Sequence, residues 1–285
     1  MLTINSENLT IVTFATFGKY RSHRDYTDFV VRLRQSCSIL GLNLLVFSYA
    51  TDSVEADFVL QDRTYPMRKG AGYWSWKHEV IREASKYAKT RYLMYLDSDL
   101  ILSRLPNFSK VSNFDELGVA VFQSDDDLVY WTSKRCLKYF GIRNNQNDKI
   151  FYAGSILLDL HNRRSFDFLD TWEKHLLKDR LLLDPFWSFS LNHRHDQSIL
   201  SCLVAVSEVQ VALLPSGFFQ TGSVNQSSQS EAWLIHGETN ILNESKIVSF
   251  LSSLKSRLFH KFELGFFLFH TFFSNFKIKI MDLFQ

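Results

Sequence analysis

Two aspartates one residue apart, Asp97 and Asp99, are the residues of this sequence whose spacing most directly suggests chemistry. They end and follow the apolar segment 91–97 (RYLMYLD), which we expect to form a buried strand. Mg²⁺ and Mn²⁺ prefer oxygen ligands and are usually held by one or two carboxylates together with substrate phosphates. The pair therefore predicts a site for a divalent cation and a diphosphate, although a solvated turn can carry the same pattern.

The elements around this pair predict an α/β fold. Residues 9–15 and 42–49 are short apolar runs typical of strands, and residues 25–40 between them have helical spacing. Strand, helix and strand in this order form a βαβ unit, which implies a parallel sheet. Further helices are expected at 76–88, 163–178 and 196–206, and further strands at 117–122, 150–160 and 209–214. Open sheets of this kind bind ligands at the carboxyl ends of their strands.

Composition agrees with one large catalytic domain. The chain has 285 residues, of which 46% are hydrophobic, and a formal net charge of +2, so it can bury a large core and is neither disordered nor collagen-like. Its three cysteines lack metal-ligand spacing, which indicates a reducing compartment. We see no signal-peptide pattern and no apolar run of about 18 residues, so we expect a cytoplasmic location. Nucleic-acid binding is not expected, because basic residues do not cluster in the main domain.

Five short blocks occur in the order found in GT-A glycosyltransferases. They are GAGYWSWK (70–77), YLDSDLIL (95–102), YAGSILL (152–158), HDQSIL (195–200) and WLIHG (233–237). In these blocks the sequence resembles the glycogenin-like and bacterial lipooligosaccharide galactosyltransferase family of nucleotide-diphospho-sugar transferases, although Tyr152 stands where that family often has Asn. The resemblance covers roughly residues 9–240 and implies a GT-A (Rossmann-like), mostly parallel sheet flanked by helices.

The resemblance also implies site residues. Asp97, Asp99 and His236 would bind the metal, Mn²⁺ or Mg²⁺, and Gly237 would let the backbone approach the phosphates because it has no side chain. The other positions implied to contact the nucleotide-sugar donor are Thr13, Ala15, Thr16, Lys77, Ser98, Ala153, Gly154 and Ser155. Structural alternatives remain open: His236 as a packing residue, strand-end caps for the threonines, and a solvated helix lysine for Lys77.

Asp196 and Gln197 would lie beside the anomeric carbon of the donor sugar. The resemblance implies transfer with retention, for which a double displacement needs a carboxylate nucleophile such as Asp196. In the alternative, front-face attack, the leaving diphosphate takes the acceptor proton and Gln197 steadies positive charge on the sugar. Asp196 could instead be the N-cap of the helix 196–206.

Three further groups have two interpretations each. Trp74 and Trp76 belong either to the core or to a surface that stacks on a base or sugar. The acidic run 125–127 is expected to be a solvated loop, with acceptor binding or a base for an inverting enzyme as the alternative. His193 and His195 are candidates for the acceptor side of the site.

The C-terminal segment 246–285 differs from the rest of the chain. It holds ten of the 26 Phe residues, and its six basic and two acidic residues give it a net charge of +4. Its apolar residues recur at helical spacing, and a basic, aromatic amphipathic helix is typical of a segment that lies in a membrane interface. We therefore expect a catalytic domain over 1–245 and a tail over 246–285 that binds peripherally to the cytoplasmic face of a membrane. Packing of the tail on the domain, or an oligomer contact, is the alternative.

Together these features predict a metal-dependent glycosyltransferase. It would move a sugar from a nucleotide-diphosphate sugar, expected to be a UDP-sugar, to a glycan or lipid-linked acceptor. The alternatives are an inverting GT-A transferase, a nucleotidyltransferase and a non-catalytic membrane-surface binding protein. A nucleotidyltransferase would need a Gly-rich basic loop after the first strand, which the segment 13–24 (TFATFGKYRSHR) matches poorly.

Overall fold

A computed structural model describes most of the chain up to residue 236. The described residues are 4–17, 25–49, 55–60, 74–105, 108, 111–143, 147–178 and 193–214, with the backbone alone of 219–220 and 234–236. The chain divides into two compact units, Met1–Glu238 and Thr239–Gln285. The expected tail at 246–285 lies outside the described residues. Within the described part, no helix has both the length and the apolar character needed to cross a membrane.

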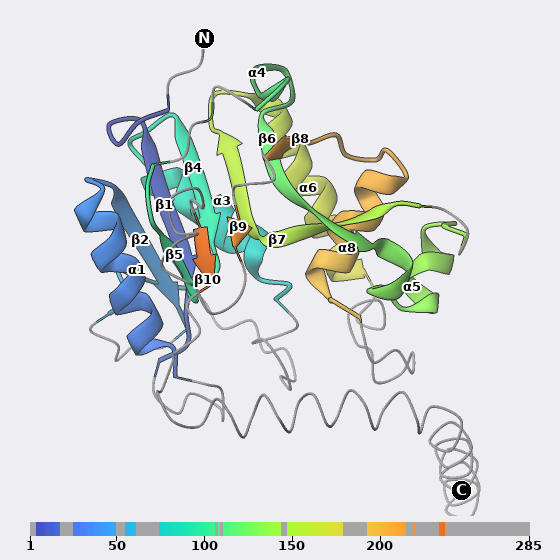
Figure 1. The fold of residues 1–285 in the computed structure, drawn as a ribbon, viewed down its shortest axis with the longest axis horizontal. Helices are drawn as coiled ribbons and strands as arrows, with labels where there is room; N and C mark the ends of the chain where they lie inside the picture. The colour runs from blue at the N-terminus through green and yellow to red at the C-terminus, as the bar shows by residue number, and fades with distance from the viewer. Residues whose placement is uncertain are drawn as a thin grey trace, which may run out of the picture. The chain divides into compact units, whose positions relative to one another are not determined.

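A seven-stranded sheet forms the centre of the first unit (Figure 1). Its strand order is β3-β2-β1-β4-β7-β6-β8. Strand β7 runs antiparallel to its neighbours β4 and β6, and the other neighbouring pairs are parallel. The predicted α/β class with a mostly parallel sheet is therefore confirmed. The strands are β1 (Leu9–Phe14), β2 (Asn43–Ser48), β3 (Phe58–Val59), β4 (Tyr92–Leu96), β6 (Val119–Asp127), β7 (Lys149–Asp159) and β8 (Ala212–Leu214).

Helices cover both faces of this sheet. The helices are α1 (Thr27–Ile39), α3 (Lys77–Tyr87), α4 (Phe114–Leu117), α5 (Lys134–Tyr139), α6 (Arg163–Lys178) and α8 (Asp196–Ala205), with a 3₁₀ turn at Leu128–Tyr130. One apolar cluster joins the sheet to α3, α5, α6 and α8, and a second joins the opposite face to α1 and α4. Strand β4 contributes alternately to both, because successive side chains of a strand point to opposite faces. Leu93 and Tyr95 belong to the first cluster, whereas Tyr92, Met94 and Leu96 belong to the second.

A smaller sheet begins just after the two aspartates. It consists of β5 (Leu100–Leu102), β10 (Leu234–His236) and β9 (Phe219–Gln220), in the order β5-β10-β9. Strand β10 pairs with β5 in the antiparallel direction, with His236 opposite Leu100. This register brings the backbone of the late WLIHG block next to the residue that follows Asp99.

Strand β7 contains an irregularity that matters for the site. Val121 of β6 pairs with Ile156, but the next residue, Phe122, pairs with Tyr152. The intervening residues 153–155 are left without partners in β6, while Ser155 still pairs with Leu96 of β4. Bulges of this kind bend a strand and redirect its groups next to active sites.

The expectation of a solvated loop at 125–127 was wrong, because β6 continues to Asp127. Asp127 pairs in register with Lys149 of β7, and the Lys149 ammonium lies 2.7 Å from Asp127 Oδ1 and 2.8 Å from the Asp125 carbonyl oxygen. The cross-strand cation offsets the repulsion among the neighbouring carboxylates, so this acidic segment can extend the strand. The expected strand at 209–214 is shorter, Ala212–Leu214.

Candidate active site

The ammonium of Lys77 is the centre of the candidate site. Lys77 is the first residue of α3, and only 3% of its side chain is exposed. Its Nζ lies 3.0 Å from Asp97 Oδ1, 3.1 Å from Asp196 Oδ2 and 3.1 Å from the Ala153 carbonyl oxygen, to which it donates. The interpretation of Lys77 as a solvated helix lysine was therefore wrong. Four of the five sequence blocks each supply one of these groups.

Asp97 is held in place by the end of the sheet. Its backbone N–H donates to the Gly154 carbonyl oxygen (2.8 Å), and its own carbonyl accepts the Leu100 N–H (3.0 Å), which closes a tight turn. Its carboxylate is one-quarter exposed and accepts the Tyr95 hydroxyl at Oδ1 (2.7 Å). Asp99 lies in the same turn and is half-buried. The turn thus presents two carboxylates at the carboxyl end of β4.

The Asp196 side chain lies in the candidate site and does not cap helix α8. The N-cap of α8 is His195, and no side chain caps this helix, so the N-cap interpretation of Asp196 was wrong. Only 5% of the Asp196 side chain is exposed, and its carboxylate instead lies against Lys77. Burial raises the pKa of Asp196 to about 6, against the opposing effect of the Lys77 charge.

The charges of the acidic side chains at the site favour the binding of a cation. Burial alone would lower the pKa of Lys77, but the charges of Asp196 and Asp97 outweigh burial and raise that pKa, so the ammonium stays charged. The Lys77 ammonium lies close to two carboxylates, those of Asp97 and Asp196. Burial first, and then the charges of Asp97, Asp99 and Asp196, raise the pKa of Tyr152. Asp97 and Asp196 flank this ammonium and Asp99 lies in the same turn as Asp97, so negative charge exceeds positive charge, and a divalent cation can compensate the difference.

Gly154 is required by close packing. A Cβ atom at this position would lie 2.5 Å from Asp97 Oδ2 and 2.5 Å from the Tyr152 ring. Real Cβ atoms do not approach other atoms so closely, so a side chain here would displace the carboxylate or the ring. The absence of a side chain at Gly154 therefore lets the Asp97 carboxylate and the Tyr152 ring pack directly against this part of β7.

Of the three predicted metal ligands, the structure describes the side chains of two, Asp97 and Asp99, and both suit a hard divalent cation. Asp97 and Asp99 supply carboxylate oxygens, and the pairing of β10 with β5 places the backbone of His236 opposite Leu100. Nothing is described of the His236 side chain, and Gly237 lies outside the described residues. Among the side chains that the structure describes, no group of three His, Cys, Asp or Glu could hold a metal. The donor set that the described residues contribute is thus two carboxylates, which is what Mg²⁺ or Mn²⁺ commonly uses together with substrate phosphates.

Most of the other predicted donor-site residues are buried. Thr13 donates its hydroxyl to the Leu96 carbonyl oxygen (2.7 Å), which ties β1 to the strand that carries Asp97. Gln197 follows Asp196 in the first turn of α8, and its N–H donates to the Arg194 carbonyl (3.1 Å). Ala15, Thr16, Ser98, Ala153 and Ser155 are each less than 9% exposed. The contacts therefore join Lys77, Asp97, Ala153 and Asp196 directly, whereas for Ala15, Thr16 and Ser98 the structure shows burial alone.

The tryptophans and histidines near the site pack against one another. Trp76 is buried, with its ring centroid 3.9 Å from that of Phe14, so the core interpretation holds for it. Trp74 stacks on His195 (5.4 Å), and both residues have a positive φ, +59° and +52°. Strained backbone of this kind persists at functional sites when the surroundings enforce it. His193 is 4% exposed and accepts the Ser133 N–H at Nδ1 (3.1 Å), so its ring is used in packing.

Sequence reasoning missed Tyr95. The available signal was its position two residues before Asp97, because side chains two apart in a strand lie on the same face. It also missed the Ala153 carbonyl as an acceptor for Lys77, which no pattern of side chains could indicate.

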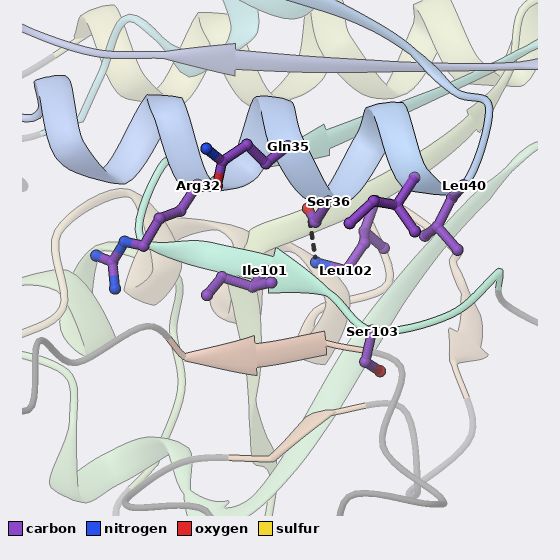
Figure 2. Close-up of a pocket in the computed structure, with 8 residues that line it drawn as sticks. Arg32, Gln35, Ser36, Leu40, Ile101, Leu102 and Ser103 are labelled. Atoms are coloured by element: carbon purple, nitrogen blue, oxygen red, sulfur yellow. Dashed lines mark hydrogen bonds between the residues drawn. The ribbon is translucent and has the colours of Figure 1, made fainter.

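A groove lies on the opposite face of the sheet from Lys77. It has a volume of about 310 Å³ and lies between α1 and β5. Figure 2 shows Ser36 of α1 accepting the Leu102 N–H (3.4 Å) within this groove. Its remaining lining residues are Arg32, Gln35, Ile39, Leu40, Ile101 and Ser103. None of the described residues that line it is acidic, and none belongs to the predicted site.

Comparisons with known proteins identify similar structures but no related sequence. No protein-family model and no curated protein sequence matches the chain. Solved structures that resemble it include mouse xyloside xylosyltransferase 1, with a TM-score of 0.47 at 13% identity, covering 82% of this chain and 98% of that one. A glycosyltransferase involved in the glycosylation of the major capsid of PBCV-1 has a TM-score of 0.46 at 12% identity, and the match covers 84% of this chain and 96% of that one. The galactosyltransferase LgtC has a TM-score of 0.43 at 12% identity, and the match covers 80% of this chain and 86% of that one. All three are described as glycosyltransferases.

Proposed function

We propose that this protein is a metal-dependent glycosyltransferase that uses a nucleotide-diphosphate sugar. The observation that carries the proposal is the convergence on one ammonium, that of Lys77, of groups from four separate sequence blocks. A solvated turn at Asp97 would not need a buried lysine, a second buried carboxylate and a glycine without room for a Cβ. An ion-paired cluster of this kind at a sheet edge is typical of functional sites.

Each residue then has a chemical task. Asp97 and Asp99 would hold Mn²⁺ or Mg²⁺, with His236 as the third protein ligand. When bound, the cation neutralises charge on the departing nucleotide diphosphate. Lys77, which stays charged, would orient the donor phosphates or sugar and hold the Asp196 carboxylate in place.

Asp196 and Gln197 would act at the sugar. With a pKa of about 6, the Asp196 carboxylate is ionised in most molecules at pH 7.5. An ionised carboxylate is what stabilises positive charge at the anomeric carbon during transfer with retention, either as a nucleophile or through its field. Gln197, the next residue on α8, would contact the same sugar.

The proposal also covers the donor, the acceptor and the location of the protein. We expect a UDP-sugar as donor and a glycan or lipid-linked acceptor, with the Phe-rich tail binding peripherally to the cytoplasmic face of a membrane. The support for the tail is its composition, ten Phe and a net charge of +4 over residues 246–285. Flotation with anionic liposomes, comparing the full chain with a chain that ends at Glu244, tests it. Equal flotation of the two would contradict membrane binding.

The enzyme is tested by donor binding and turnover. UDP-, GDP- and dTDP-sugars are compared by thermal shift in Mn²⁺, because a bound ligand stabilises the folded state in proportion to the logarithm of its concentration over Kd. Turnover of the best donor should be lost with a chelator and in D99A. The matched control is D167A, since Asp167 is an aspartate of α6 with 59% of its side chain exposed and belongs to none of the predicted site groups. Activity unaffected by chelator and by D99A would overturn the proposal.

A further inference from the structure

Tyr95 touches both charged partners at the centre of the site. It is fully buried in β4, and its hydroxyl donates to Asp97 Oδ1 at 2.7 Å. The Lys77 ammonium lies 5.4 Å from the centroid of its ring, within the range of a cation–π contact. Trp76 packs against the same ring in an edge-type arrangement, with centroids 6.4 Å apart. One side chain thus contacts the carboxylate, the cation and the core.

We propose that Tyr95 is a positioning residue, which fixes the Asp97 carboxylate so that Oδ2 is offered to the divalent cation. This inference rests on the proposed metal-dependent function. Oδ1 is already engaged by the Tyr95 hydroxyl at 2.7 Å and by Lys77 Nζ at 3.0 Å. Oδ2 makes only a longer contact with Lys77, 3.4 Å, and packs against Gly154, so it is the less strongly hydrogen-bonded of the two oxygens.

The physical reason is rotational freedom. A carboxylate at the end of a strand can turn about its last side-chain bond, and a metal must then bind the fraction of molecules with the right orientation. A short hydrogen bond from a buried donor removes that freedom in advance. The Tyr95 hydroxyl is such a donor, because its side chain is fully buried and it lies 2.7 Å from Asp97 Oδ1. Partners of this kind behind metal ligands typically change metal affinity about 10- to 100-fold.

Y95F separates this role from packing, because phenylalanine keeps the ring against Lys77 and Trp76 and removes only the hydroxyl. Y92F is a matched control. Tyr92 is on the same strand, is 3% exposed, and its side chain packs in the other core cluster. D97N, which removes the charge of the proposed ligand itself, tests the metal site independently.

Mn²⁺ binding to the full-length chain is measured by the loss of the free-ion signal in electron paramagnetic resonance, with urea unfolding of each variant as a check of the fold. We expect Y95F to weaken Mn²⁺ binding about 10-fold or more, Y92F to bind as the unmodified chain, and D97N to lose binding. Equal Mn²⁺ affinity of Y95F and the unmodified chain, with binding lost in D97N, would overturn the role of Tyr95 and leave the metal site intact. Undiminished binding in D97N, or no binding by the unmodified chain, would overturn the metal site and the role of Tyr95 together.

Discussion

Replacing Lys77 by methionine should destabilise the protein in a pH-dependent manner. Methionine retains most of the volume of the buried stem and removes the ammonium, which lies 3.0 Å from Asp97 Oδ1 and 3.1 Å from Asp196 Oδ2. Removing one partner of a buried ion pair commonly costs about 3–5 kcal/mol, since the other charge stays buried without compensation. We expect a loss of this size in the free energy of unfolding at pH 8.

The pH dependence follows from Asp196. In the unmodified protein its pKa is raised from 3.8 to about 6, so the folded state binds the extra proton between these values. The associated stability is fully present below pH 3.8 and is lost as the pH rises through about 6, a change of about 3 kcal/mol. Without Lys77, which lowers this pKa, Asp196 should hold its proton to still higher pH. The difference in unfolding free energy between K77M and the unmodified chain should therefore shrink from pH 8 to pH 5.

Urea unfolding at pH 5 and pH 8, followed by tryptophan fluorescence, measures this effect. K86M is the matched control, because Lys86 lies on the same helix with 59% of its side chain exposed and pairs with Glu83 one helical turn earlier. The double variant K77M/D196N should recover much of the lost stability, since it removes the uncompensated charge. A K77M protein as stable as the unmodified chain at pH 8, or a loss that is equal at both pH values, would refute the reasoning.

Three further predictions concern packing and ion pairing. G154A should lower the free energy of unfolding by about 1–3 kcal/mol and weaken Mn²⁺ binding, because its Cβ would come within 2.5 Å of Asp97 Oδ2; calorimetry and Mn²⁺ titration check this. R91Q should cost about 1.5–3 kcal/mol in urea unfolding, because Arg91 donates to both oxygens of Asp159, which is 1% exposed; an unchanged midpoint would contradict it. The three cysteines are buried, and burial raises the pKa of Cys37 to about 12, so a thiol reagent should modify all three rapidly only after denaturation; fast reaction of the native chain would contradict this.

Much of the fold could be predicted because its elements follow local patterns. The helical spacing at 163–178 and the apolar segment 91–97 each indicate one element, and both expectations match α6 and β4. The aspartate run at 125–127 misled the prediction, because its charges favour a loop unless a cation lies opposite. Lys149 provides that cation only after β6 and β7 pair in one particular register.

The sequence by itself determined the class of the fold and the pair of aspartates at the end of β4, since both depend on residue types at short spacing. The tertiary structure decided which alternatives hold for Lys77 and Asp196. A lysine at the start of a helix is ordinarily solvated, and an aspartate there ordinarily caps the helix. Here the packing of α3 and α8 on one face of the sheet buries both side chains, and the bulge in β7 turns the Ala153 carbonyl toward the same ammonium. Burial makes an unpaired charge costly, so these residues must pair with each other, and such pairing between distant segments is set by strand register and helix packing rather than by neighbours in the chain.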